Sequence, residues 1–154
     1  MIIAGKRPST VKAASFNLIK KFAKKCLREL SKKEHELNIP YAKAVMNLSA
    51  SSSPFGNYGR GGRKGIWINV YHFERGEGFC WEYASYRKDP VIGECNFGNP
   101  EQALFGLVAH EMSHHVQYAY CPNTRMYKSK YRKPHGECFQ DLYRILRSRL
   151  VNVF

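Results

Sequence analysis

Two histidines four residues apart, with a glutamate directly after the first, form the most specific chemical pattern in this chain: His110, Glu111 and His114. On a helix, residues four apart lie on the same face, so both imidazoles can bind one zinc ion. Glu111 lies about 100° to one side of the pair, where its carboxylate can act on water without competing for the metal. The spacing therefore predicts a hydrolytic zinc site with Glu111 as the catalytic residue.

A catalytic zinc usually takes three protein ligands and leaves the fourth position to water. His135 is the third ligand that we favour, because it stands at the start of a segment whose apolar residues recur every three or four positions. Glu137 is the competing ligand and would give the other common set, two histidines and a glutamate. Cys138 would close the site as a fourth protein ligand, which fits only a structural zinc. His115 points about 100° away from His114 and is not expected to be a ligand.

These residues also give the chain a resemblance to a known family. His110-Glu111-x-x-His114, then His135-Gly136-x-x-Phe139 and a helix with leucines at turn spacing resemble the SprT-like zinc metalloproteases, which include the DNA-protein crosslink protease Spartan. The resemblance covers roughly residues 100–150. It implies that the first two histidines and the one before the glycine bind zinc, and that the glutamate is the catalytic base. The chain departs from the family pattern in a longer interval after His114 and in having no cysteine-pair zinc ribbon.

Three helices are expected to position this site. An amphipathic helix is predicted from residue 9 or 10 to about residue 33, with apolar residues on one stripe and lysines opposite. The motif helix is predicted from Pro100 to about Tyr120, because Asn99 is a good N-cap and proline is favoured at the first helical position. A C-terminal helix is predicted after His135.

Between these helices the sequence favours strands and glycine-bearing loops. The predicted strands are residues 44–49, 66–73 and 79–86. Residues 51–65 are predicted to form a flexible basic loop, either a long hairpin connection or a mobile arm over the cleft. We therefore predict one α+β domain over residues 1–154, with a small, mostly antiparallel sheet. The resemblance implies a zincin-like minimal metalloprotease domain, in which an edge strand pairs with an extended peptide; residues 66–73 are the candidate for a strand near the cleft.

The charge balance points to an anionic partner. There are 25 Lys and Arg against 12 Asp and Glu, which leaves a formal net charge of +13. The basic residues concentrate at 6–33 and 125–133, a distribution expected of a nucleic-acid binder, although a merely solvated basic surface would look the same. We expect nucleic acid as a partner, DNA rather than RNA. The candidate contacts are Lys20, Lys24, Arg60, Arg63, Lys64, Lys128, Lys130, Arg132 and Lys133.

Composition bears on the state of the cysteines and on the cellular compartment. The five cysteines are scattered and never form a Cys-x-x-Cys pair, so reduced thiols are expected rather than a disulfide framework or a second zinc site. No run of residues has the apolar length of a signal peptide or a membrane span, and we expect a cytoplasmic protein that does not bind membranes.

Taken together, the residues and the resemblance predict a zinc-dependent metallopeptidase that hydrolyses peptide bonds of proteins on or near nucleic acid. Two alternatives stay open: a non-proteolytic basic zinc-containing module that binds nucleic acid or protein, and a metal-dependent hydrolase of another bond, such as a nuclease. A donor to the developing oxyanion is expected among Tyr118, Tyr127, Tyr131 and His115.

Overall fold

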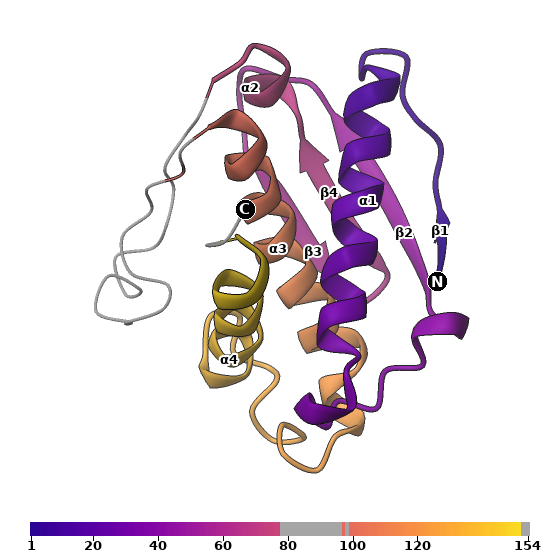
Figure 1. Ribbon diagram of the computed structural model, residues 1–154, viewed down its shortest axis with the longest axis vertical. Helices are drawn as coiled ribbons and strands as arrows, with labels where there is room; N and C mark the ends of the chain where they lie inside the picture. The colour runs from indigo at the N-terminus through magenta and orange to yellow at the C-terminus, as the bar shows by residue number, and fades with distance from the viewer. Residues whose placement is uncertain (78–96, 98, 152–154) are drawn as a thin grey trace.

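A computed structural model describes residues 1–77, 97 and 99–151 of the chain (Figure 1). These residues form a mixed fold of helices and one small sheet, in agreement with the predicted α+β class. The strands are β1 (Ile2–Ala4), β2 (Val45–Ser51), β3 (Gly59–Gly62) and β4 (Gly65–Asn69). The helices are α1 (Ala13–Leu30), α2 (Tyr71–Glu74), α3 (Pro100–Ala119) and α4 (Glu137–Leu146), with the 3₁₀ helices η1 (Lys33–His35), η2 (Tyr41–Lys43) and η4 (Cys121–Asn123) and the π-helical segment η5 (Arg147–Val151).

The sheet has the order β1-β2-β4-β3. β1 pairs with β2 and β2 with β4 in parallel, and only β3 and β4 are antiparallel. The prediction of a mostly antiparallel sheet is therefore wrong. Parallel neighbours need a long crossover connection, and α1 supplies it between β1 and β2. β4 then inserts between β2 and its own hairpin partner β3, which gives the second parallel pair.

The sheet is buried on one face. Along β2 the side chains of Met46, Leu48 and Ala50 are buried, while the residues between them are exposed. Ile66 and Ile68 of β4 continue the buried face. α1 and α3 lie side by side over this face (Figure 1), as expected when side chains alternate between the two sides of a strand. The core of the molecule is therefore the layer between the two helices and the sheet.

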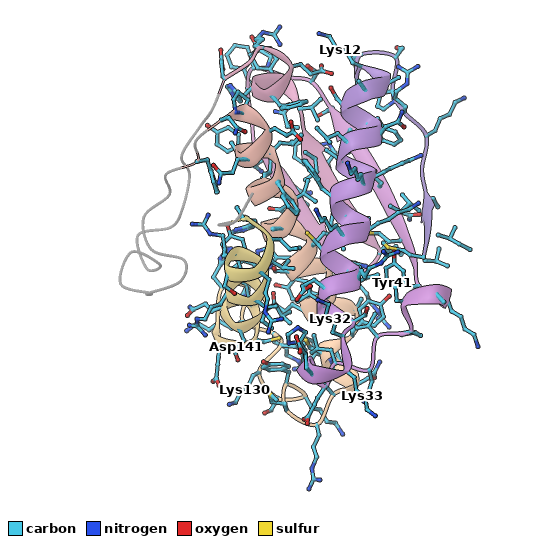
Figure 2. The ribbon with its side chains drawn as sticks, viewed as in Figure 1. Lys12, Lys32, Lys33, Tyr41, Lys130 and Asp141 are labelled. Atoms are coloured by element: carbon cyan, nitrogen blue, oxygen red, sulfur yellow. The ribbon has the colours of Figure 1, made fainter. Side chains whose placement is uncertain are left out.

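α1 is the long amphipathic helix that the sequence predicts, although it is shorter at both ends. Its buried stripe faces α3, where Phe22 stacks on Phe105 with ring centroids 4.4 Å apart. Lys12 lies at the start of the helix and Lys32 just beyond its end (Figure 2). In the part of the chain that the structure describes, neither α1 nor any other helix combines the length and the apolar character that crossing a membrane requires.

The predicted strand 66–73 is too long. β4 ends at Asn69, whose side-chain oxygen accepts hydrogen bonds from the backbone N–H groups of Ser53 and Tyr71, each at 3.1 Å. These bonds turn the chain out of the sheet and into α2. The predicted strand 44–49 is confirmed as β2, whereas the predicted strand 79–86 lies outside the described residues.

A carboxylate distant in sequence caps the start of α1. Lys12, the N-cap residue, makes no side-chain cap of its own. Instead, Glu74 of α2 accepts a hydrogen bond from the Lys12 backbone N–H (3.0 Å) and another from the Ser15 hydroxyl (2.6 Å). Glu74 therefore satisfies an otherwise unpaired donor at the start of the helix and ties α2 to α1.

Replacing Glu74 with alanine is expected to lower the free energy of unfolding by about 1 kcal/mol, the usual effect of losing an N-cap acceptor. Urea denaturation monitored by circular dichroism measures this. Glu77→Ala is the matched control, because Glu77 makes only a half-exposed ion pair with His72 and should cost far less. Equal losses of stability in the two variants would show that the cap contributes nothing specific.

Candidate metal site

The helix α3 begins as the sequence predicts. The side-chain oxygen of Asn99 accepts a hydrogen bond from the backbone N–H of Gln102 at 2.7 Å, and Pro100 occupies the first helical position. Every residue from Ala103 to Gln117 is buried, because β3, β4, α1 and α4 pack around the helix. The motif at its centre is therefore enclosed by protein on several sides.

Three histidines converge beside this helix. His110 and His114 project from α3 with 2% and 7% of their surface exposed. His135 reaches them from the segment that precedes α4, and its Nε2 lies 3.0 Å from Nε2 of His114. One ring nitrogen from each of the three lies within 4.8 Å of the others. Three imidazoles at this separation can share one metal ion.

The ring of Phe139 in α4 packs against all three imidazoles. Its centroid lies 4.2 Å from that of His114, 4.8 Å from that of His110 and 5.0 Å from that of His135. An aromatic ring in this place keeps water from one side of the cluster and restricts the rotation of the imidazoles. The Phe139 position in the His135-Gly136-x-x-Phe139 pattern thus has a packing role in the site.

The competing third ligands lie elsewhere. Glu137 forms an ion pair with Lys130 at 3.0 Å, and its side chain is 61% exposed. The buried thiol of Cys138 hydrogen-bonds with the thiol of Cys121. Neither Glu137 nor Cys138 belongs to the histidine cluster. Among the three candidates, the geometry favours His135.

Gln117 orients one of the histidines, a role that the sequence indicates only through its position three residues after His114. Its side-chain oxygen lies 3.0 Å from Nδ1 of His114, and its amide donates a 2.7 Å hydrogen bond to the backbone carbonyl of Lys133. Because the Gln117 oxygen accepts a hydrogen bond from Nδ1–H of His114, the lone pair of Nε2 is free for a metal. Gln117 also links α3 to the segment that carries His135.

Burial keeps the three imidazoles neutral. Burial lowers the pKa of His110 well below its usual range, and the neighbouring His114 and His135 lower it further. Burial lowers the pKa of His114 to about 4, although the hydrogen bond with Gln117 acts in the opposite direction. The pKa of His135 is also lowered by burial. Neutral imidazole is the form that binds metal, so the cluster is ready for a cation at neutral pH.

Glu111 is the acidic group of the site. It is 5% exposed, and one of its carboxylate oxygens lies 3.8 Å from Nε2 of His110. Burial raises the pKa of Glu111 to about 8, although the positive charge of Arg60 acts against this shift. A carboxyl group with this pKa can hold or release a proton near neutral pH, which suits a general base. A cation bound to the histidines would favour its ionised form.

The edge strand β3 lies directly against this part of α3. A Cβ atom on Gly59 would lie 2.9 Å from Cγ of Glu111, and one on Gly61 would meet the backbone oxygen of Glu111 and lie 2.8 Å from Cβ of His114. The prediction of a flexible loop over 51–65 is therefore wrong for its second half, which is a strand packed on the motif helix. β3 is the strand at the edge of the described sheet, and the segment 66–73, the candidate for a strand near the cleft, contributes β4, which lies next to it.

Two adjoining hollows border the site and share Gly59, His110 and Glu111. One, of about 210 Å³, contains the histidine cluster and is also lined by Arg60 and Tyr118. The other, of about 310 Å³, extends along residues 56–59 to Leu107. Together they form a cleft that passes along β3 and meets Glu111 in its middle.

No protein-family model, curated protein or solved structure matches this chain. The geometry of the cluster and the resemblance of the motif are therefore the grounds on which a function can be argued.

Of the four candidate oxyanion donors, only Tyr118 lines the hollow that contains the histidines. The hydroxyl of Tyr127 donates a 2.9 Å hydrogen bond to Asp141, and Nδ1 of His115 donates one of 2.8 Å to the carbonyl of Gly62. Tyr131 borders a different hollow. His115 thus anchors β3 to α3.

The nine candidate nucleic-acid contacts fall into three groups. Lys20 and Lys24 lie on α1. Residues 60, 63 and 64 surround the turn between β3 and β4 and border a hollow of about 390 Å³ that also includes Trp67. Residues 128–133 lie before His135, where Lys130 is paired with Glu137 and Nε of Arg132 donates a hydrogen bond to Tyr131. Arg63 and Tyr131 line one hollow, so the second and third groups adjoin each other.

A second group of potential ligands lies at the end of α1. Oxygen or nitrogen atoms of Glu29, Glu34 and His35 also come within 4.8 Å of one another. Cationic side chains already pair with them: Arg149 lies 2.9 Å from Glu34 and 3.6 Å from Glu29, and Lys32 contacts Glu29. The histidine cluster, whose imidazoles are neutral, is the better candidate for a metal.

Proposed function

We propose that this protein is a zinc-dependent metallopeptidase of the zincin-like, SprT-like type. The observation that carries the proposal is the convergence of three neutral imidazoles, two of them buried and one half-buried, beside a buried carboxyl group. Imidazole ligands suit zinc, and three protein ligands leave a position open for reaction. His110, His114 and His135 would hold the metal.

Zinc supplies Lewis acidity, which lowers the pKa of water and polarises a carbonyl group. The chain supplies the proton transfers. Glu111 would take a proton from the attacking water and later give it to the leaving amine, and a cation held by the three histidines would favour the ionised form that accepts the proton. Gln117 holds the imidazole of His114 in orientation through both steps. Tyr118, at the wall of the hollow, is placed to donate a hydrogen bond to the developing oxyanion.

A polypeptide in an extended conformation is the substrate that the cleft fits best. β3 pairs with β4 along one side, and among the described residues no strand pairs with its other side. A peptide can add to such an edge through backbone hydrogen bonds, which bring its carbonyl groups past Glu111 with little demand on its sequence. The net charge of +13 favours proteins held on or near nucleic acid, with DNA the expected polymer.

Elemental analysis of the purified protein tests the metal. We expect about one zinc per chain in the unaltered protein, loss or strong weakening of zinc binding in His135→Ala, and full retention in Glu137→Ala, the matched control two residues away. Zinc that stays in His135→Ala and leaves in Glu137→Ala would move the third ligand to Glu137. A folded protein without zinc affinity would remove the ground for the proposal.

Incubation with a denatured protein tests the activity. Peptide products are expected with zinc and not after treatment with a chelator. Addition of single-stranded DNA to parallel reactions asks whether cleavage depends on nucleic acid. Zinc binding without peptide products would favour a non-proteolytic binding module, and release of nucleotides in place of peptides would favour a nuclease.

A further inference from the structure

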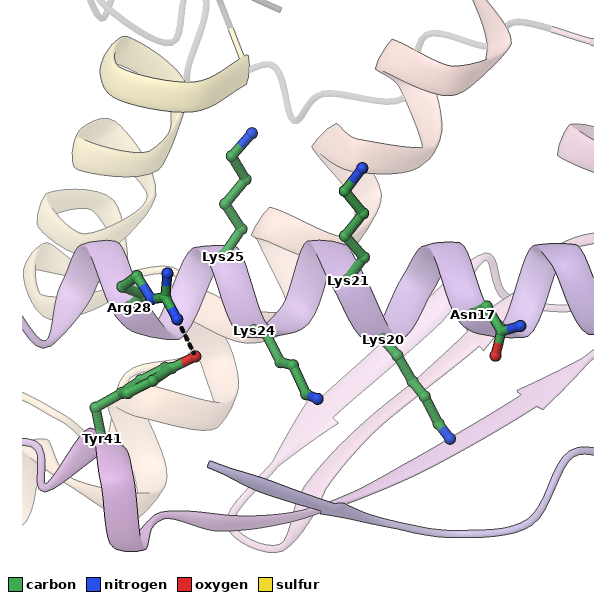
Figure 3. A pocket seen from close by; sticks show the side chains of 7 residues that line it. All are labelled: Asn17, Lys20, Lys21, Lys24, Lys25, Arg28 and Tyr41. Atoms are coloured by element: carbon green, nitrogen blue, oxygen red, sulfur yellow. Dashed lines mark hydrogen bonds between the residues drawn. The ribbon is translucent and has the colours of Figure 1, made fainter.

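The outer face of α1 carries a second feature, built from residues that the histidine site does not use. A groove of about 510 Å³ runs along it (Figure 3). Lys21 and Lys25 project to one side of the helix, and Lys20 and Lys24 project to the other (Figure 3). Arg28 stands at the end of the groove, beside Tyr41 of η2. Asn17 completes the lining.

Among the described residues, these five cations have no acidic partner. No carboxylate oxygen there lies within 4.0 Å of any of them, although the nearby Lys32 and the distant Lys130 do form such pairs. Like charges four residues apart on a helix, such as Lys20 with Lys24 and Lys24 with Arg28, destabilise it. The row therefore opposes folding of α1, and an anionic ligand would relieve that repulsion.

Aromatic rings restrain three of the cations, one of which is Lys25, whose Nζ lies 5.9 Å from the ring centroid of Phe105. Nζ of Lys20 lies 5.0 Å from the ring centroid of Phe16, and the guanidinium of Arg28 lies 5.2 Å from that of Tyr41. Nη2 of Arg28 also donates a 3.4 Å hydrogen bond to the Tyr41 hydroxyl. Cation–π contacts of this kind reduce the freedom of long side chains, so less entropy is lost when a ligand binds them.

We propose that this groove binds the sugar-phosphate backbone of single-stranded nucleic acid. Lys20, Lys24 and Arg28 follow one another at intervals of four residues, about 6 Å along the helix axis. This rise is comparable with the separation of successive phosphates in an extended strand. The cations lie on one helix and can follow one backbone, whereas the two backbones of a duplex are separated by grooves of about 6 and 12 Å. Contacts to phosphates alone give binding with little base preference.

The groove shares no residue with the cleft beside β3. Nucleic acid bound along α1 would leave the histidine site open to a protein substrate. Only the purpose of this binding rests on the proposed peptidase. Nucleic acid held along α1 would keep the enzyme near proteins bound to the same polymer. The binding itself requires neither zinc nor Glu111.

Fluorescence anisotropy with a labelled single-stranded oligonucleotide of mixed sequence tests the groove. Lys20→Gln/Lys24→Gln is expected to weaken binding about tenfold and to reduce the slope of log K against log salt by about 0.7 for each phosphate that the variant no longer neutralises. Lys6→Gln/Lys33→Gln is the matched control: it removes the same charge from exposed residues that do not line the groove, and it should bind like the unaltered protein. Equal weakening in both variants would show diffuse attraction and overturn the proposal, as would unchanged binding in the groove variant.

Two further arms identify the ligand. A duplex of the same sequence and vesicles containing an anionic phospholipid are expected to bind more weakly than the single strand and to depend less on Lys20 and Lys24. Tighter, Lys20- and Lys24-dependent binding of either one would overturn the assignment to single strands. Repeating the titration with chelator separates the two proposals, because unchanged oligonucleotide binding supports the groove whether or not the peptidase activity is found.

Discussion

Glu111→Gln is expected to lower the rate of peptide hydrolysis by about 10²- to 10⁴-fold, the usual contribution of a general acid–base group, while the variant still binds about one zinc. Glutamine matches the shape of the protonated carboxyl group that burial favours at this position, so the fold should be kept. It cannot accept and pass on a proton. Hydrolysis of a denatured protein substrate and zinc content, measured on the same preparation, check both halves of the expectation.

Glu101→Gln provides the comparison for this variant. It makes the same change on the same helix, but Glu101 is exposed in the first turn of α3 and lies outside the cleft. Its activity should equal that of the unaltered protein. Retained turnover in Glu111→Gln would rule out the general-base role, and loss of zinc along with turnover would make Glu111 part of the metal-binding set.

Gly61→Ala is expected to lower the free energy of unfolding by about 3 kcal/mol and to weaken zinc binding. The added methyl group would meet the backbone oxygen of Glu111 and lie 2.8 Å from Cβ of His114. Neither neighbour can rotate away, because one is a backbone oxygen of α3 and the other is a Cβ atom whose position that backbone fixes. Either β3 moves outward or α3 shifts, and both displacements disturb the cluster.

Gly62→Ala is the control for crowding, since a Cβ atom there would have no atom within 4 Å. We expect it to change the stability and the zinc affinity by little. Urea denaturation and competition with a chromogenic zinc chelator measure the two quantities. Equal behaviour of the two alanine variants would mean that the close approach of β3 to α3 has no energetic weight.

Local signals made some elements predictable. The start of α3 follows from Asn99 and Pro100, whose side chain and ring act on the first turn alone. β2 follows from alternation of apolar and polar residues within one strand. The pairing of strands depends instead on where distant segments meet. β1 has three residues and β3 consists of three glycines and an arginine, so neither has the composition and length by which a strand is recognised in sequence.

In the site, too, some features follow from local sequence and others depend on contacts between distant segments. The spacing of His110 and His114 is a property of one helix and could be derived from sequence. Which of His135 and Glu137 lies beside these two histidines could not be derived from the sequence, because it depends on the path of the chain from η4 to the start of α4. Gln117 takes part in that return through its bond to the carbonyl of Lys133. Gly59 and Gly61 lie on one face of a strand, where two glycines can indicate a closely packed neighbour. The sequence does not show that this neighbour is α3.

The close contact of β3 with α3 would couple the two proposed binding events, that of zinc and that of a peptide. Through Gly61 the strand that would receive a substrate touches the backbone at Glu111 and the side chain of His114, and through Gly62 it accepts a hydrogen bond from His115. A peptide that tightens this contact would raise the affinity of the histidines for metal. Thermodynamic reciprocity then requires the metal to raise the affinity for that peptide by the same factor. Zinc would act in this protein both as a reagent and as a positive effector of substrate binding.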